Sequence, residues 1–173
     1  MVRSFVGRAR RAYTLVEMLI VVVILGIAAA LVVPAMGDTD VLRVQAAVRT
    51  IIADITYAQS EAVAHQEGRA IVFHADEGRY AVVQVVNGVV DETTGLLYET
   101  RLDQSLMGDA RITQVEFGED DVLVFDEVGA PAFGENGQPP ESGKLEIEGS
   151  GQRFTVTIDG YTGRVTVART DLP

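Results

Sequence analysis

The chain has 173 residues, a formal net charge of -11 and no cysteine. This length suits one ordinary domain with an appendage. The lack of cysteine excludes disulfides, thiolate metal sites and cysteine nucleophiles. The acidic charge argues against binding to nucleic acid or anionic lipid, because both are polyanions.

The amino end is basic and is followed by a long apolar run. The first twelve residues carry four arginines and no acid, and the apolar run over 15–36 contains one charged residue, Glu17. A helix over this run would be about 33 Å long, which is enough to cross a hydrocarbon core of about 30 Å. We therefore predict a single-pass transmembrane helix half over residues 13–36, with the basic end inside.

The residues alone allow three interpretations of this segment. It is a plain membrane anchor, an ordinary signal peptide cut after Gly37, or a leader of residues 1–12 cut between Ala12 and Tyr13. A carboxylate in lipid costs a few kcal/mol and usually has a partner. Only the third interpretation supplies one, because the new α-amine of Tyr13 in one subunit can neutralise Glu17 of another. Glu17 would then set the axial register of a filament.

The residues RRAYTLVEMLIVVVILGIAAALVVPAM (10–36) resemble the class III leader of type IV pilins and type II secretion pseudopilins. In that family a basic leader ends in Gly and is followed by Phe-Thr-Leu-Ile-Glu and an apolar helix. Here Ala12 stands for the Gly and Tyr13 for the Phe. The resemblance implies cleavage by prepilin peptidase after Ala12 and N-methylation of the Tyr13 amine. It also implies that Pro34 kinks or locally unwinds the helix, as proline does in general.

The next segment predicts an amphipathic helix half over residues 37–67. Apolar residues recur there at steps of three and four, and Gly68 is the expected terminator after Gln66. The stripe consists of Val41, Val44, Val48, Ile51, Ile55, Ala58 and Ala62. One continuous helix over 13–66 and two helices hinged at 34–40 both fit this pattern.

From residue 68 to the end at 173 the apolar period becomes two, which predicts a globular β domain. The expected strands cover 70–74, 79–86, 111–117, 121–126, 144–148, 153–159 and 164–168, with turns at the Gly-containing stretches between them. Residues 134–143 are an expected surface loop. The predicted fold class is α+β, with the helix packed on an antiparallel β-sheet domain.

Three stretches are similar to GspH/FimT-type minor pseudopilins and minor pilins: ITYAQSEAVAHQEGRAIVF, VLVFDEVGAPA and IDGYTGRVTVAR. The resemblance implies a minor pilin or pseudopilin in a type II secretion pseudopilus or a type IV pilus. Its implied partners are prepilin peptidase, other subunits, the inner-membrane assembly platform and exported cargo. The implied location is the bacterial inner membrane, with the β domain on the periplasmic side.

No enzyme, cofactor or metal site is expected. The two histidines, His65 and His74, have no third ligand at a suitable spacing. The acidic run Glu119, Asp120 and Asp121, with Asp126, lacks the alternating ligands of a dedicated calcium loop and is expected to be a solvated hairpin end.

Two alternative functions belong to other classes. Some FimT-type pilins bind DNA through basic residues near the carboxyl end, where this chain has Arg164 and Arg169. The acidic charge of the body argues against DNA binding here. The other alternative is a soluble β domain released by ordinary signal peptidase.

Overall fold

The computed structural model describes residues 13–32, 37–102, 107–117, 121–132 and 142–172. The chain divides into two units, residues 1–38 and 39–173. The first unit contains helix α1 (Leu15–Val32), and helix α2 (Gly37–His65) supplies the start of the second unit. The predicted kink at Pro34 lies outside the described residues, as does the join that would make one helix of residues 13–66.

Helix α1 is apolar along its whole length, apart from Glu17 near its start. Among the described residues, no helix combines the length and the apolar character that a membrane span requires.

Helix α2 buries one face, as its periodicity predicts. Six residues of the predicted stripe are buried, Val41 is half-buried, and Ala47 joins the buried set. The predicted terminator Gly68 is wrong, because the helix ends at His65 and Gln66 is the residue that caps it. Gln66 adopts a left-handed φ of 53°, and the Glu67 N–H donates to the Ala62 carbonyl, which is the hydrogen bond of a Schellman cap. Gly68 has a different role: a Cβ there would lie 2.9 Å from Cβ of Val85.

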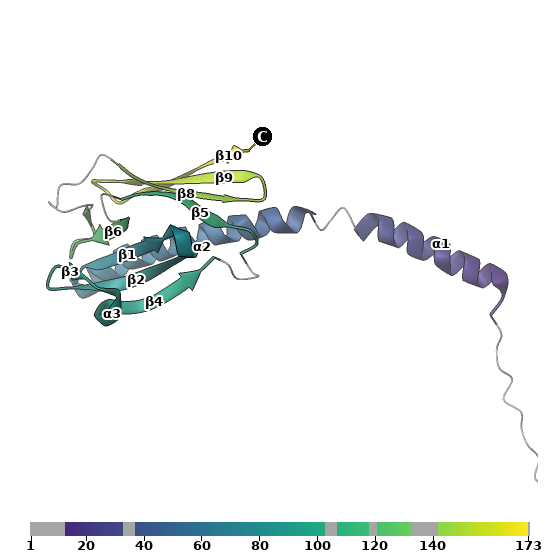
Figure 1. Ribbon diagram of the computed structural model, residues 1–173, viewed down its shortest axis with the longest axis horizontal. Coiled ribbons are helices and arrows are strands. Elements are labelled where there is room, and N and C mark those ends of the chain that lie inside the picture. The colour runs from purple at the N-terminus through teal and green to yellow at the C-terminus, as the bar shows by residue number, and fades with distance from the viewer. Residues whose placement is uncertain (1–12, 33–36, 103–106, 118–120, 133–141, 173) are drawn as a thin grey trace, which may run out of the picture. The chain divides into compact units, whose positions relative to one another are not determined.

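The first sheet follows α2 and is antiparallel throughout (Figure 1). Its order within the described residues is β3-β2-β1-β6-β7, and β4 also pairs with β2. The hairpin of β1 and β2 is joined by a short 3-10 turn over Ala75–Glu77, with Gly78 at a left-handed φ of 61°. The strands are β1 (Arg69–His74), β2 (Arg79–Val86), β3 (Val89–Val90), β4 (Leu96–Arg101), β6 (Val122–Phe125) and β7 (Pro131–Ala132).

The second sheet contains the carboxyl-terminal strands. Its order in the described part of the chain is β10-β9-β8-β5, again antiparallel. Burial alternates along β8 and along β9 from Arg153 onward, so one face of this sheet is in the core. The strands are β5 (Arg111–Glu116), β8 (Ser142–Gly149), β9 (Gln152–Asp159) and β10 (Val165–Asp171).

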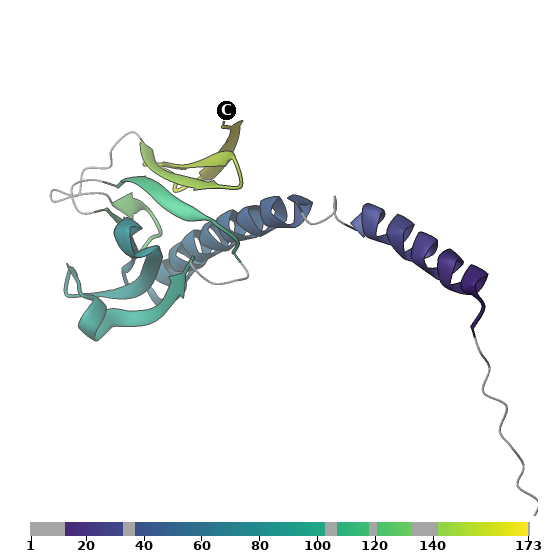
Figure 2. The ribbon, with the colours of Figure 1, turned by 45° about the vertical axis from the view of Figure 1, so that its right-hand side comes forward.

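One hydrophobic core joins the helix to both sheets, and Figure 2 shows α2 running beside them. The apolar face of α2 meets Ile71, Phe73, Tyr80, Val82, Leu123 and Phe125 of the first sheet and Ile112, Leu145, Ile147, Phe154, Val156 and Ile158 of the second. The α+β prediction with an antiparallel domain on the helix is therefore confirmed, and the structure adds that the domain uses two sheets.

The β domain differs from the sequence prediction in some of its elements and in one loop. The two-residue strands β3 and β7, the strand β4 and the short helix α3 (Glu92–Gly95) were not expected. The predicted loop over 134–143 is wrong at its end, because Ser142 and Gly143 pair with β9 in strand β8. The remainder of that loop lies outside the described residues.

A polar contact fixes α2 against the first sheet at one point. The hydroxyl of Tyr80 donates to Asp54 Oδ2 at 2.6 Å, and the Tyr80 ring packs at a tilt against Phe73 with centroids 5.8 Å apart. Burial raises the pKa of Tyr80, and the neighbouring Asp54 carboxylate raises it further. The tyrosine is therefore neutral and acts as the donor at neutral pH.

We expect Tyr80→Phe to lower the free energy of unfolding by about 1–3 kcal/mol, because Asp54 loses the hydrogen bond from Tyr80 inside a partly buried site. Tyr161→Phe is the control, since Tyr161 is exposed on a turn. Urea unfolding of the full chain in detergent, followed by circular dichroism, measures both variants. Equal stability of Tyr80→Phe and the control would show that this contact contributes nothing.

Candidate assembly segment and surface sites

The start of α1 is organised around Thr14. Its side-chain Oγ1 accepts the backbone N–H of Glu17 at 3.2 Å, and its carbonyl accepts the N–H of Met18. Thr14 is thus the N-cap and Glu17 the third helical residue, which is the spacing of a capping box. A carboxylate there is also favoured by the positive end of the helix dipole. The sequence Thr-Leu-Val-Glu has the spacing of this box, so the N-cap role of Thr14 can be predicted from the sequence.

The side chains described on the first unit, from Tyr13 through residue 29, are all exposed. Tyr13 is 71% exposed and Leu15 is 83% exposed. A helix that is apolar on every side is normally covered by lipid or by other protein. This segment is therefore a surface that needs a partner.

The predicted processing and assembly residues are only partly within the described chain. Tyr13 and Glu17 lie together at the exposed start of α1. Ala12 and Pro34 lie outside the described residues, so cleavage at the first and a kink at the second stay predictions.

The two arginines proposed for DNA contact are flanked by acids. Arg169 lies on the edge strand β10, and its Nε is 3.6 Å from Asp171 Oδ1. Arg164 precedes the strand. Hydrogen bonds from Thr162 lower the pKa of Asp159, and the charge of Arg164 adds a smaller effect in the same direction. Neither position adds to a basic patch that would track a phosphate backbone.

The two histidines and Asp126 have structural partners. Nε2 of His65 is 3.2 Å from Glu61, and Nε2 of His74 is 2.5 Å from Glu92. Asp126 Oδ1 accepts the N–H groups of Val128 and Ala130 and so closes a turn. Among the described residues no group of acids and histidines is arranged to hold a metal. Glu119 and Asp120 lie outside the part described.

A known family model matches the amino-terminal segment. Residues 7–33 match the family model described as the prokaryotic N-terminal methylation motif. This chain carries an N-terminal methylation motif. The match spans the predicted cut between Ala12 and Tyr13, and it includes Thr14, Glu17 and all of α1.

Solved structures with the same fold come from two machines. The type IV minor pilin FimU of Pseudomonas aeruginosa (strain PAO1) is similar with a TM-score of 0.54 and 17% identity, over 75% of this chain and 91% of FimU. The minor pseudopilin EpsH from the type 2 secretion system of Vibrio cholerae is similar with a TM-score of 0.52 and 14% identity, over 73% of this chain and 96% of EpsH. No curated protein matches the sequence. The fold is therefore pilin-like.

We expect the full chain in nonionic detergent to give no mobility shift with double-stranded DNA at low salt, because acids flank both candidate arginines. A shift that weakens as salt rises, and that disappears in Arg164→Ala with Arg169→Ala, would contradict this expectation. Arg153→Ala is a matched control, since Arg153 is engaged by Glu146 and Glu148 on the same sheet.

Proposed function

We propose that the protein is a minor pilin or pseudopilin, a structural subunit that is processed by prepilin peptidase and assembled into a filament. The observation that carries the proposal is the methylation motif over residues 7–33, which leads directly into the exposed apolar helix α1. The pilin-like α+β fold of the second unit supports it. The protein is a substrate of an enzyme in this proposal and has no catalytic role.

The proposed route begins in the inner membrane, with residues 13–36 as the transmembrane half-helix and the β domain on the periplasmic side. The peptidase cuts after Ala12 and the amine of Tyr13 is methylated. The helix then moves from lipid into a bundle of equivalent helices, so its apolar surface stays covered while Glu17 gains the amine of a neighbouring subunit. Gly26 suits close helix packing, since no atom lies within 4 Å of where its Cβ would be.

The finer assignment is to the GspH/FimT type, with prepilin peptidase, sibling subunits, an inner-membrane assembly platform and exported cargo as partners. FimU is named as a type IV minor pilin and EpsH as a type 2 secretion minor pseudopilin. The proposal therefore includes both a type IV pilus and a type II secretion pseudopilus as the assembly. DNA uptake is not favoured, because Arg169 is paired with Asp171 and the chain is acidic.

The mature amino terminus tests the processing step. We expect mass spectrometry of membrane-extracted protein to find a chain that begins at Tyr13 with a methylated amine. A chain that begins at Asp38 would mean an ordinary signal peptide. An intact chain from Met1 would mean a plain anchor, and the filament proposal would fall with it.

A set of Glu17 variants separates the two roles that its position allows. Glu17→Gln keeps a side chain suited to the capping box but removes the charge that would pair with an amine. If charge pairing is the role, Glu17→Gln and Glu17→Ala lose filament incorporation to a similar extent, by about tenfold or more for a pair buried among helices.

Thr14→Ala is the matched control, because it removes the N-cap and leaves the charge. We expect it to weaken α1 locally, by about 1 kcal/mol, and to leave most incorporation intact. Incorporation is measured by shearing filaments from cells and quantifying the subunit, with the membrane fraction as the reference for insertion. Normal incorporation of Glu17→Gln would refute charge pairing and leave capping as the role.

A further inference from the structure

The first sheet has an apolar face that α2 does not cover. Along β1, β2, β3 and β6, residues that point away from the helix form a second hydrophobic cluster. Ala70, Ala81 and Val83 are buried in it, and Val72, Val85, Val90, Val122 and Val124 are partly buried. The face is nearly all valine and alanine, so it offers a broad apolar floor with few polar groups.

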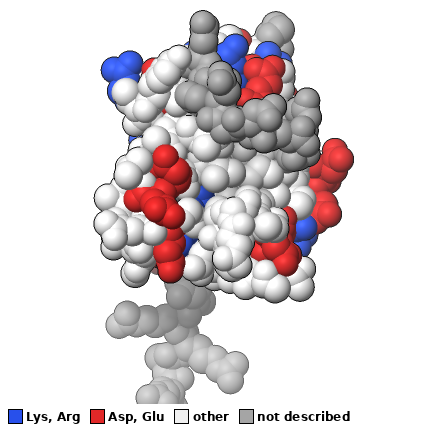
Figure 3. All heavy atoms as spheres, turned by 90° about the vertical axis from the view of Figure 1, so that its left-hand side faces the viewer, with Lys and Arg blue, Asp and Glu red and all other residues white. Residues whose placement is uncertain are grey.

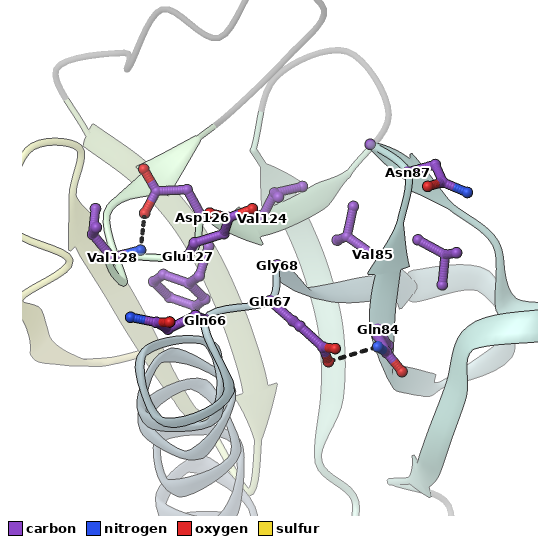
Figure 4. Close-up of a pocket in the computed structure, with 13 residues that line it drawn as sticks. Gln66, Glu67, Gly68, Gln84, Val85, Asn87, Val124, Asp126, Glu127 and Val128 are labelled. Carbon is purple, nitrogen blue, oxygen red and sulfur yellow. Dashed lines mark hydrogen bonds between the residues drawn. The ribbon is translucent and has the colours of Figure 1, made fainter.

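Two adjoining cavities lie over this face, with volumes of about 720 Å³ and 690 Å³. They share Val85, Gly88 and Val124, so together they form one groove. Figure 4 shows the first cavity, with Val85 and Val124 between the ends of β2 and β6. Each cavity is the size of a small-molecule pocket, and the pair exceeds what one such ligand fills.

The rim of the groove also exposes apolar side chains. Val86 follows the floor at the end of β2, Val89 begins β3, and Val128 stands on the turn after β6 with 78% of its surface exposed. These residues extend the apolar surface beyond the cavities, which is typical of a surface that binds another protein.

The charged residues that line the groove, among those described, are all acidic. Among the described lining residues there is no lysine, arginine or histidine, whereas five are acidic: Glu67, Asp91, Glu92, Asp126 and Glu127. In the end-on view of Figure 3, uncharged surface lies between two groups of acidic side chains.

Part of this acidity is uncompensated. Glu67 pairs with Arg69, and Glu92 pairs with Arg79. Asp91, Asp126 and Glu127 have no cationic partner among the described residues. Asp91 and Asp126 are instead fixed by backbone N–H groups, since Thr93 donates to the first and Val128 and Ala130 donate to the second. The groove thus presents oriented negative charge beside an apolar floor.

We propose that this groove binds an extended segment of a partner protein in which basic and apolar residues alternate. The apolar side chains would cover the valine floor, and the basic ones would meet the uncompensated carboxylates. A second copy of this chain fits less well, because the chain carries a net charge of -11 and two copies repel one another. Anionic lipid and nucleic acid are disfavoured for the same reason. The inference concerns the second unit and goes beyond the proposed assembly through α1.

The test uses the full chain in nonionic detergent and a fluorescein-labelled peptide of alternating lysine and valine, measured by fluorescence anisotropy at low salt against protein-free micelles. We expect saturable binding. A peptide that alternates lysine with serine binds at least about tenfold more weakly, since covering one valine is worth about that factor. A peptide that alternates glutamate with valine also binds more weakly, because the carboxylates of the rim repel it.

Two exposed residues of the rim give variants that leave the core intact. We expect Glu127→Lys to weaken binding of the lysine–valine peptide by about fivefold, because attraction is lost and repulsion is added. Val128→Ser weakens binding of the same peptide by a similar factor, because an apolar contact is lost. The matched controls lie elsewhere: Asp76→Lys on the 3-10 turn and Val167→Ser on β10 change binding by less than about twofold.

The outcomes are decisive in either direction. Loss of binding confined to the two rim variants supports the groove. No binding of the lysine–valine peptide, or equal weakening by the controls, overturns it. Self-association of the full chain that Glu127→Lys abolishes, with peptide binding unchanged, would assign the groove to a second copy and would also overturn the proposal.

Discussion

The second unit depends on one constraint: a single face of α2 must serve as core for two sheets at once. Its buried face combines the large residues Ile51 and Ile55 with small alanines at 47, 58 and 62, which let strands approach closely. Gln59 lies at the edge of that face. Its Nε2 donates to the Gly129 carbonyl at 2.8 Å, and a Cβ on Gly163 would lie 2.4 Å from the same nitrogen. One turn from each sheet thus closes on the same helical side chain, and glycine is needed at both because each has a left-handed φ.

This arrangement leaves two apolar surfaces that the domain itself does not cover. The two sheets fill the buried face of α2, so the outer face of the first sheet contributes only a small satellite cluster around Ala81 and Val83. Helix α1 is uncovered on every side. The two surfaces differ in charge, because α1 carries one carboxylate at its start whereas the groove has acids along its rim. They therefore suit different partners: α1 fits lipid or copies of itself, and the groove fits a cationic protein segment.

Much of this fold follows from periodicity in the sequence, and the exceptions have physical causes. The spacing of Val44, Val48 and Ile51 predicts the buried face of α2, and alternation predicts β8 and β9, because both patterns report burial directly. Strand β4 (Leu96–Arg101) is mostly exposed at the sheet edge, so apolar and polar residues do not alternate regularly in its sequence, LLYETR. Contacts such as Tyr80 with Asp54 join residues 26 positions apart, and no local pattern encodes such a pairing. Glu17 combines both situations. Its capping role can be predicted from its spacing to Thr14, whereas a partner in another subunit cannot be predicted from a local pattern.

The position of Glu17 reconciles a membrane segment with an assembled one. As the third residue of α1 it lies in the field of the unsatisfied N–H groups, which stabilises a carboxylate by a few tenths of a kcal/mol to about 1 kcal/mol even without a cation. That contribution lowers the cost of holding the charge at the lipid interface. In the proposed filament the amine of a neighbouring Tyr13 would bring a full positive charge to the same place. The stabilisation then rises only when helices dock in one register, and this difference between lipid and filament, rather than the apolar surface, would drive assembly.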